Sequence, residues 1–240
     1  MAGQRPSDAS TPAPWFNPPD RPSSRRTLTR ERVVAEALAI IAADGAQALS
    51  MRALAARLGV VPGALYRHVR GKEELYDLVL DAVLGEVDCR TDSGAPWAAQ
   101  VAALAHRLRA VLESRPGTAV LLKTREPLSP TSLDLAEAFL GPLLAAGLPG
   151  REAAQGFRLI YDYTVGFALA DPTSPAEQRL SDSSTRERLH AFFRALPADR
   201  FPALSTSGLH AWDGDRDQRF TAGLEPLLRG IEAYQPAPGG

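Results

Sequence analysis

The chain of 240 residues is 45% hydrophobic and 23% charged, a balance that is ordinary for a globular protein and excludes wholesale disorder. No apolar run approaches the roughly 18 residues of a membrane-spanning helix, and the chain does not begin with the apolar segment of a secretory signal. Its single cysteine, Cys89, excludes an internal disulfide and a Cys-based zinc site. We therefore expect a cytoplasmic protein without membrane contact.

The net charge of −1 conceals a strong segregation of charge along the chain. Between Arg21 and Lys72 there are ten basic and three acidic residues, a net charge of +7, which leaves −8 for the rest. A basic block joined to an acidic body is typical of proteins that bind nucleic acid. Local chance is the other explanation, and the motifs within the block decide between the two.

The chain begins with a segment that lacks periodicity. Residues 1–27 are rich in Pro, Ser, Ala and Arg, so we predict a disordered tail. Thr29 is then placed to cap a first helix, which ends at Asp44-Gly45. The apolar positions of this helix recur at helical spacing: Val33, Ala37, Ile40 and Ile41.

Two short predicted helices separated by a glycine follow. Ser50 is placed to cap Met51–Leu58, and Gly59 ends that helix. Pro62 lies near the first position of the next helix, which we expect to run through His68. This pattern indicates a helix-turn-helix, whose second helix enters the major groove of DNA and reads base edges. An αα-hairpin within a hydrophobic core is the alternative.

The remainder of the chain is also predicted to be helical. A fourth helix over 72–90 connects the basic block to the body. Apolar stripes predict further helices near 97–112, 133–143, 151–171 and 216–234, and a shorter helix is expected over 185–196. The second of these stripes consists of Leu133, Ala136, Phe139, Leu140 and Leu143. Connectors rich in Pro and Ser lie at 171–184 and 197–212, and Pro226 should kink the last helix or mark its first turn. The predicted fold is all-α, with a three-helix domain over 28–72 and a larger helical domain over 91–236.

Residues Thr27 to Asp88 resemble the DNA-binding domain of the tetracycline-repressor (TetR) family of bacterial transcription regulators. The resemblance rests on ALSMRALAARLGV and on LYRHVRGKEEL, with its tyrosine, histidine and following lysine. The rest of the chain is similar more weakly, through Trp97 at the start of a helix, the segment RPGTAVLLKTREP and the closing apolar helix. The resemblance implies a homodimer that binds a palindromic operator and a small-molecule inducer.

The resemblance also implies a set of DNA contacts. They come from Ser50, Met51, Arg52, Pro62, Gly63, Ala64, Tyr66, Arg67, His68 and Lys72, with Arg25, Arg26 and Arg30 as a basic arm. Arg52 falls where the family has an arginine that reads guanine, and Lys72 where a lysine holds phosphate. Tetracycline repressors carry glutamine in place of Pro62, so a different operator is expected. His68 packing on the first helix, and Tyr66 as a half-buried aromatic, are the alternative interpretations.

A ligand pocket in the C-terminal domain follows from the same resemblance. Its candidate residues are Trp97, Leu104, Leu121, Thr124, Arg125, Phe139, Phe157, Tyr161, Thr164 and Phe167, with Arg125 and Thr164 as polar handles and ordinary core as the alternative. Tetracycline repressors bind a drug–magnesium chelate through histidines where this chain has Asp88 and Leu121. Since leucine cannot ligate a metal, we expect no metal or cofactor and an inducer that is apolar or aromatic.

Dimerisation is expected through the helices near 151–171 and 216–234. The candidate interface residues are Leu159, Tyr163, Gly166, Phe220, Leu224, Leu227, Leu228 and Ile231. The sequence thus predicts a homodimeric repressor that an inducer releases from its operator. An architectural DNA-binding protein, or an activator without an inducer, is the alternative. An enzyme that carries a helix-turn-helix is disfavoured, because no catalytic constellation or glycine-rich phosphate loop occurs.

Overall fold

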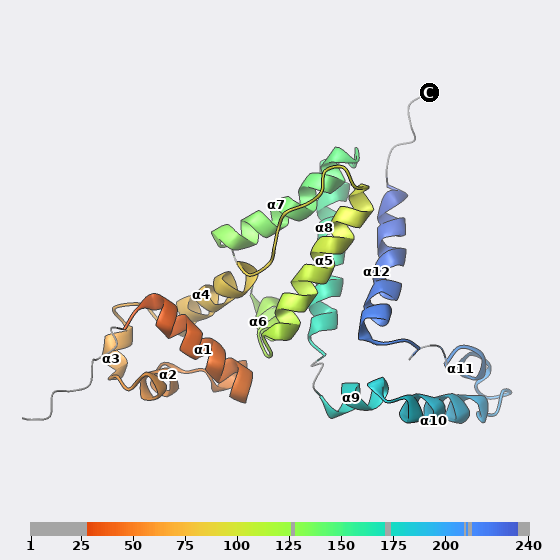
Figure 1. Cartoon of the computed structure of the whole chain (residues 1–240), viewed down its shortest axis with the longest axis horizontal. Helices are drawn as coiled ribbons and strands as arrows, with labels where there is room; N and C mark the ends of the chain where they lie inside the picture. The colour runs from red at the N-terminus through yellow and green to blue at the C-terminus, as the bar shows by residue number, and fades with distance from the viewer. Residues whose placement is uncertain (1–27, 126–127, 171–173, 209, 211–212, 235–240) are drawn as a thin grey trace, which may run out of the picture.

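A computed structural model describes residues 28–125, 128–170, 174–208, 210 and 213–234, the side chains at 176, 180 and 181 excepted. Every regular element in these ranges is helical (Figure 1). The predicted all-α fold, with a helix-turn-helix at one end and a larger helical body, is confirmed. The predicted tail over 1–27 lies outside the described residues.

The N-terminal helices follow from their caps. The Thr29 side chain accepts a hydrogen bond at the start of α1 (Arg30–Asp44), and the Ser50 side chain does the same for α2 (Met51–Leu58). A short 3₁₀ turn, η2 (Ala46–Ala48), lies between them. Gly59 ends α2 with a φ of 67°, a conformation that favours glycine. α1, η2 and α2, together with α3 (Pro62–Leu65), form what we call the head.

The third helix is shorter than predicted. The regular part of α3 covers Pro62–Leu65 and does not run through His68. The N–H groups of His68 and Val69 both donate to the carbonyl of Leu65, at 2.8 and 3.0 Å. In a regular α-helix each successive N–H donates to the next carbonyl along the chain. The helix therefore ends where two successive N–H groups share one carbonyl.

The fourth helix, α4 (Lys72–Leu84), also ends earlier than the predicted 72–90. Gly85 closes it, and its N–H donates to the carbonyl of Asp81. Asp88 then accepts the N–H of Arg90 at 3.1 Å. A carboxylate that bonds the backbone two residues ahead competes with helix formation, so the chain leaves the helix before residue 90.

The body consists of five helices. They are α5 (Trp97–Ser114), α6 (Ala119–Thr124), α7 (Pro130–Ala145), α8 (Gly150–Ala168) and α12 (Arg216–Glu232). The long helix α8 packs against α5, α7 and α12. The helix α6 was not predicted, because six residues are too few to show an apolar stripe. Leu133 was assigned to the buried stripe of α7, but it is 57% exposed and Leu135 is buried instead. The helix α12 continues through Pro226.

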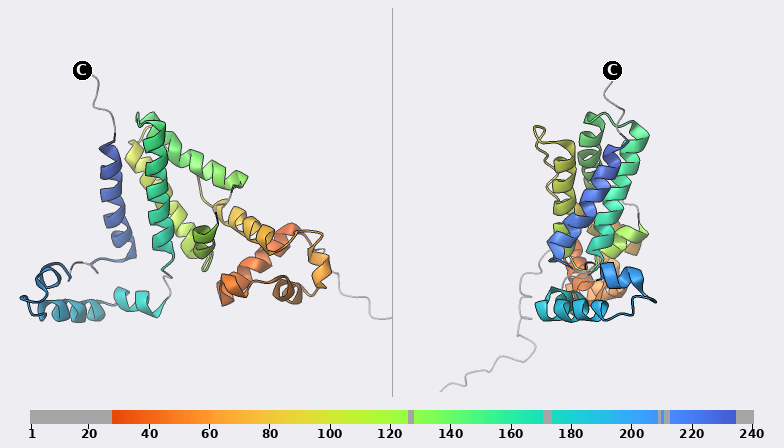
Figure 2. Two further views of the ribbon diagram at one scale, coloured as in Figure 1. Left: turned by 180° about the vertical axis from the view of Figure 1, so that it is seen from behind. Right: turned by 90° about the vertical axis from the view of Figure 1, so that its right-hand side faces the viewer.

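Three shorter helices form an arm beside the body. They are α9 (Pro175–Ser181), α10 (Ser183–Arg194) and α11 (Pro202–Ser207). Two of them fall inside the predicted connectors 171–184 and 197–212, so those predictions were wrong in part. Each of these two helices has proline at its start, where the missing N–H costs nothing, so proline there marks a beginning and not a break. Figure 2 shows the arm projecting from one end of the body.

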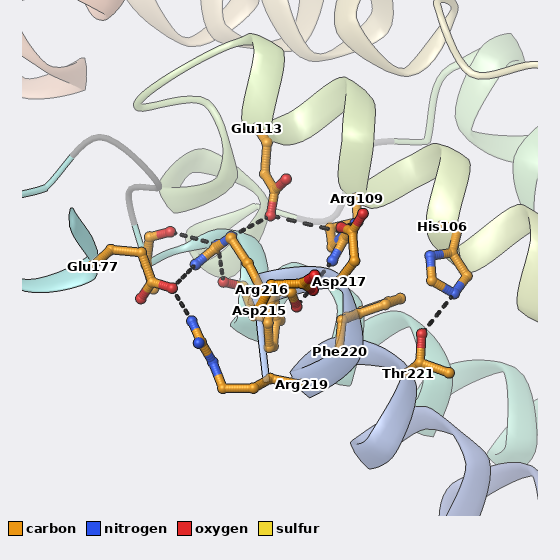
Figure 3. Close-up of polar contacts among 12 residues, drawn as sticks. His106, Arg109, Glu113, Glu177, Asp215, Arg216, Asp217, Arg219, Phe220 and Thr221 are labelled. Carbon is orange, nitrogen blue, oxygen red and sulfur yellow. Dashed lines mark hydrogen bonds and ion pairs between the residues drawn. The ribbon is translucent and has the colours of Figure 1, made fainter. Parts of the chain in front are cut away.

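A cluster of charged side chains fastens α9 to α12 and α12 to α5 (Figure 3). We call it the clasp, and its members are Arg109, Glu113, Glu177, Arg216, Asp217 and Arg219. Arg216 donates to Glu113 at 2.7 Å and to the carbonyl of Phe167 at the end of α8 at 3.0 Å. The three arginines face three carboxylates, of which Glu113 and Glu177 are largely buried and Asp217 is exposed, so each buried arginine has a carboxylate partner.

Candidate nucleic-acid interface and ligand cavity

The second helix of the helix-turn-helix presents an exposed surface. Buried Leu54 of α2 and Leu65 of α3 lie in the core of the head. On the outside, Val61 is 72% exposed and Tyr66 is 56% exposed. The other predicted reading residues divide into exposed Pro62, Gly63 and Arg67 and half-buried Met51, Ala64 and His68. An exposed aliphatic and an exposed phenol on a helix that fits the major groove suit contact with base edges and phosphates.

Arg30 does not extend from the head as part of the basic DNA-contacting arm that the sequence predicted for Arg25, Arg26 and Arg30. Its guanidinium donates to the carbonyl of His68 at 3.3 Å and pairs with Glu74 at the same distance. The expected role of Arg30 in the basic DNA-contacting arm is therefore corrected, since Arg30 ties the start of α1 to the turn before α4. Arg25 and Arg26 lie outside the described residues.

The other arginines of the head differ in their partners. Arg57 is neutralised by an ion pair with Glu36. Arg52 and Arg67 are exposed, and neither makes a hydrogen bond or ion pair with another described residue. Their guanidinium groups are thus available to an external anion or base, and Arg52 is the position at which the sequence predicted base reading.

Two further predicted DNA contacts lie at helix starts. The hydroxyl of Ser50 accepts the N–H of Ala53 at 3.1 Å, so its first task is to cap α2. Lys72 is the first residue of α4, and its ammonium lies 5.2 Å from the ring centre of Tyr76. Unpaired N–H groups and the helix dipole favour an anion at such a start. The position suits a phosphate.

A cavity of about 400 Å³ opens where α4 and α6 meet α7 and α8. Four predicted pocket residues line it: Thr124, Arg125, Phe157 and Tyr161. The lining residues that sequence reasoning missed are Leu84, Leu122, Lys123, Leu128, Ser132, Leu133, Leu135, Ala136 and Arg158. Lys123 adjoins two predicted residues, so the KTRE segment contained a signal for it. The apolar lining residues carried no such signal in the sequence, because the periodicity of apolar residues does not distinguish a cavity wall from a hydrophobic core.

Six predicted pocket residues do not line this cavity. Leu104, Leu121, Phe139 and Thr164 are buried, and Trp97 and Phe167 pack partly buried against the core. The hydroxyl of Thr164 donates to the carbonyl of Ile160 at 2.7 Å, so it is not a free polar handle. The guanidinium of Arg216 lies 4.7 Å from the ring centre of Phe167, within the clasp. For these positions the core interpretation holds.

The aromatic wall of the cavity comes from α8. The ring of Phe157 lies 5.7 Å from that of Phe139 and 5.8 Å from that of Tyr161. Burial raises the pKa of Tyr161 to about 12, so its hydroxyl stays protonated and remains a hydrogen-bond donor at neutral pH.

Arg125 connects the cavity to α4. It lines the cavity, and its guanidinium also pairs with Glu73 and, at 2.8 Å, with Asp77. Hydrogen bonding to Glu73 raises the pKa of Arg125 further above its already high value. The same guanidinium lies 5.5 Å from the ring centre of Tyr76, whose hydroxyl donates to the carbonyl of Ala46 in the head. One side chain thus touches both the cavity and the helix that leads to the head.

Most of the predicted dimer residues belong to the core of a single chain. Phe220, Leu224, Leu228 and Ile231 are buried, and the hydroxyl of Tyr163 donates to the carbonyl of Phe220. Since α12 uses this stripe to cover α8, these residues are not available to a partner, and the prediction is corrected. Leu227 is half-buried. Leu159 is 45% exposed, and the Cα of Gly166 faces open space.

The two positions that correspond to the magnesium ligands of the tetracycline repressors hold no free ligand. The Asp88 carboxylate is held by Arg90, whose hydrogen bonds lower its pKa, and Leu121 is buried. Across the described part of the chain, no three His, Cys, Asp or Glu side chains are grouped as metal ligands. In the same residues, no helix combines the length and the apolar character needed to span a membrane.

Comparisons with known proteins agree with this architecture. The family described as "Bacterial regulatory proteins, tetR family" matches residues 33–79, and "Tetracyclin repressor-like, C-terminal domain" matches residues 91–235. An HTH-type transcriptional regulator of Saccharopolyspora erythraea is 33% identical, over 95% of this chain and 94% of its own. The HTH-type transcriptional repressor DrrR1 of Streptomyces coeruleorubidus is also 33% identical, over 88% and 81%.

A solved structure shows the same fold with a ligand. ActR of Streptomyces coelicolor in complex with actinorhodin is 34% identical and superposes with a TM-score of 0.75, over 86% of this chain and 98% of that one. The helix-turn-helix, the helical body and these relatives lead to one conclusion: the chain belongs to the TetR family of bacterial transcriptional regulators.

Proposed function

We propose that the protein is a homodimeric repressor that binds a palindromic operator and is released by a small molecule in the cavity beside α6. In this proposal Arg52 reads a base, Tyr66 and Arg67 contact the groove, and Lys72 holds a phosphate. The role is regulatory and not catalytic. The relative named as a repressor and the ligand complex of ActR support repression and ligand control.

The observation that carries the proposal is the dual contact of Arg125. This residue lines the cavity and binds two carboxylates on the first two turns of α4, while Lys72 begins the same helix. A ligand that displaces Arg125 therefore changes the position of the helix that carries the phosphate contact. Release follows only if the ligand prefers a conformation that does not fit DNA.

A dimer is part of the proposal because one head contacts one half-site. Two heads related by a two-fold axis match a palindrome and bury enough surface for specific binding. The exposed side of α8, with Leu159 and Gly166, supports an interface there. Exposed Gly230 of α12 can continue it, because a residue without a side chain allows close helix approach.

The test is a titration of the full chain against duplex DNA from upstream of its own gene, with a scrambled duplex as the control. We expect specific binding roughly a thousandfold or more tighter than to the scrambled duplex at physiological salt, with two chains bound per duplex. Equal affinity for both duplexes would contradict operator recognition.

A further inference from the structure

The charged side chains among the described residues that line the cavity are cationic. Lys123, Arg125 and Arg158 line it, and no aspartate or glutamate is among the lining residues in the described part of the chain. A site built for a cation or for a neutral molecule gains nothing from these cationic groups, of which Lys123 is not already paired with a carboxylate of a described residue. Their presence beside an apolar wall indicates a ligand that carries negative charge.

The three cations differ in how far they are already neutralised. Arg125 is paired with Glu73 and Asp77, and the Nε of Arg158 donates to Asp162 at 2.8 Å. Lys123 makes no hydrogen bond or ion pair with another described residue. Its ammonium is therefore the charge with the most to gain from a ligand anion.

The remaining lining determines the rest of the ligand. Phe157 and Tyr161 offer aromatic surface, and Leu84 and Leu135 add aliphatic surface. The hydroxyl of Tyr161 makes no hydrogen bond with another described residue, so it can donate to a ligand oxygen. A flat apolar body with an acidic group at one end fits this lining.

We propose that the cavity takes an aromatic organic anion, with its ring system against Phe157 and Tyr161 and its carboxylate, sulfonate or ionised phenol at Lys123. This inference rests on the proposed function for its biological meaning, but its chemistry is tested without DNA. Arg158 adds positive potential, and Arg125 is drawn away from α4 to the extent that the ligand anion competes with Glu73 and Asp77.

The experiment compares two probes with one ring skeleton. 8-Anilinonaphthalene-1-sulfonate carries a sulfonate, and N-phenyl-1-naphthylamine lacks it. Fluorescence titration of the full chain with each probe should show the anion binding roughly tenfold or more tightly, since one charge-assisted hydrogen bond contributes about that factor. The binding should saturate at one probe per chain.

Variants assign the preference to the cavity. Lys123→Gln should weaken binding of the sulfonate roughly tenfold and leave that of the neutral probe unchanged, while Lys123→Arg should restore it. Arg151→Gln removes an exposed charge from α8 outside the lining and is the matched control. Equal affinity for both probes, failure of the sulfonate to bind, or equal loss of both probes in Lys123→Gln would each overturn the inference.

The operator titration separates this inference from the proposed function. If the chain prefers the anionic probe but does not distinguish its operator, the result supports the proposed cavity chemistry and contradicts the proposed regulatory function. If the chain binds its operator specifically but does not prefer the anionic probe, the result supports the proposed regulatory function and contradicts the anionic ligand.

Discussion

At the scale of single residues, the arginines of the head illustrate how pairing decides availability. Arg57 is held by Glu36, whereas Arg52 has no partner among the described residues. Both lie on α2 and both are exposed. The two positions therefore form a natural pair for separating a DNA contact from general positive charge.

The first prediction uses that pair together with Lys72. Arg52→Ala should cost about 1–3 kcal/mol of operator binding at one base position and relax specificity there. Lys72→Ala should weaken binding to all sequences alike and reduce the salt slope by about one. Arg57→Ala should change neither the base specificity nor the salt slope of operator binding. Titrations over a series of base-substituted operators and salt concentrations measure these effects. An unchanged base preference in Arg52→Ala would remove it from the reading role.

The second prediction concerns His106, which lies on α5 with a ring nitrogen 3.4 Å from the hydroxyl of Thr221 on α12 (Figure 3). Burial lowers the pKa of His106 below its ordinary 6.5, and its ring packs edge-on against Phe220 at 4.9 Å. The unfolded chain therefore takes up a proton first as the pH falls. The contribution of His106 to the free energy of unfolding is present above pH 6.5. It is lost as the pH falls from 6.5 through the pKa of His106 in the folded chain.

The measurement is thermal unfolding at one pH above and one pH below 6.5, for the wild type and for His106→Gln. The wild type should lose more stability on acidification than the variant, which cannot titrate at that position. An equal loss in both proteins would show that His106 does not contribute.

Residue-level prediction from sequence succeeded where the cause is local. Thr29 and Ser50 cap their helices as expected, because a capping hydroxyl needs nothing beyond the next three residues. Arg30 was misassigned because its partner, Glu74, is distant in sequence. Phe139 and Phe157 share apolar character, yet the first is buried in the core and the second lines the cavity, a difference that depends on how α7 and α8 pack.

At the scale of elements, the arm was the part least accessible to sequence reasoning. The helix near 185–196 was predicted and is present as α10, but neither α10 nor α11 contains a buried residue, so the sequence does not indicate how they pack. The contacts that attach α9 to the body are ionic, and Glu177 receives both Arg216 and Arg219. Charges that meet across distant segments leave no periodic pattern in the sequence.

The third prediction tests this attachment. Glu177 is 12% exposed, and Glu177→Gln would leave two arginines with a weaker partner. We expect the local stability of α9 to fall by about 1.5–3 kcal/mol, so that its amide hydrogens exchange roughly ten- to hundredfold faster. Glu187→Gln, an exposed glutamate on α10, is the matched control. Hydrogen exchange by mass spectrometry would contradict the clasp if α9 exchanged at the same rate in both variants.

At the scale of the whole molecule, the last helix shows why a sequence stripe does not identify an interface. The apolar stripe of α12 is real, but α8 of the same chain covers it. A buried stripe looks the same in sequence whether its partner is intramolecular or a second chain. The exposed face of α8, with Leu159, therefore replaces that stripe as the proposed dimer contact.

The fourth prediction distinguishes the two faces. Leu159→Arg should give folded monomers with a mass near 25.7 kDa and operator binding at least tenfold weaker. Leu228→Arg should unfold the chain instead, because it buries an unpaired charge. Leu144→Arg, at an exposed leucine on α7, is the control and should stay dimeric. Light scattering and circular dichroism measure these outcomes, and a dimeric Leu159→Arg protein would place the interface elsewhere.

The last prediction concerns the connection between cavity and head. Arg125 holds Glu73 and Asp77 of α4, whereas Arg158 lines the same cavity and pairs with Asp162 of its own helix. Arg125→Gln removes one tie between the body and α4, so the heads lose part of their fixed separation. We expect operator affinity without ligand to fall roughly three- to tenfold, as is typical for residues that carry coupling.

The salt dependence separates this effect from a direct DNA contact. Because Arg125 acts through α4 and touches no phosphate, Arg125→Gln should leave the salt slope of operator binding unchanged, unlike Lys72→Ala. Arg158→Gln should preserve the affinity. A reduced salt slope in Arg125→Gln would mean that Arg125 contacts DNA itself, and an unchanged affinity would mean that the other contacts of α4 with α1, α5, α6 and α7 are sufficient to position it.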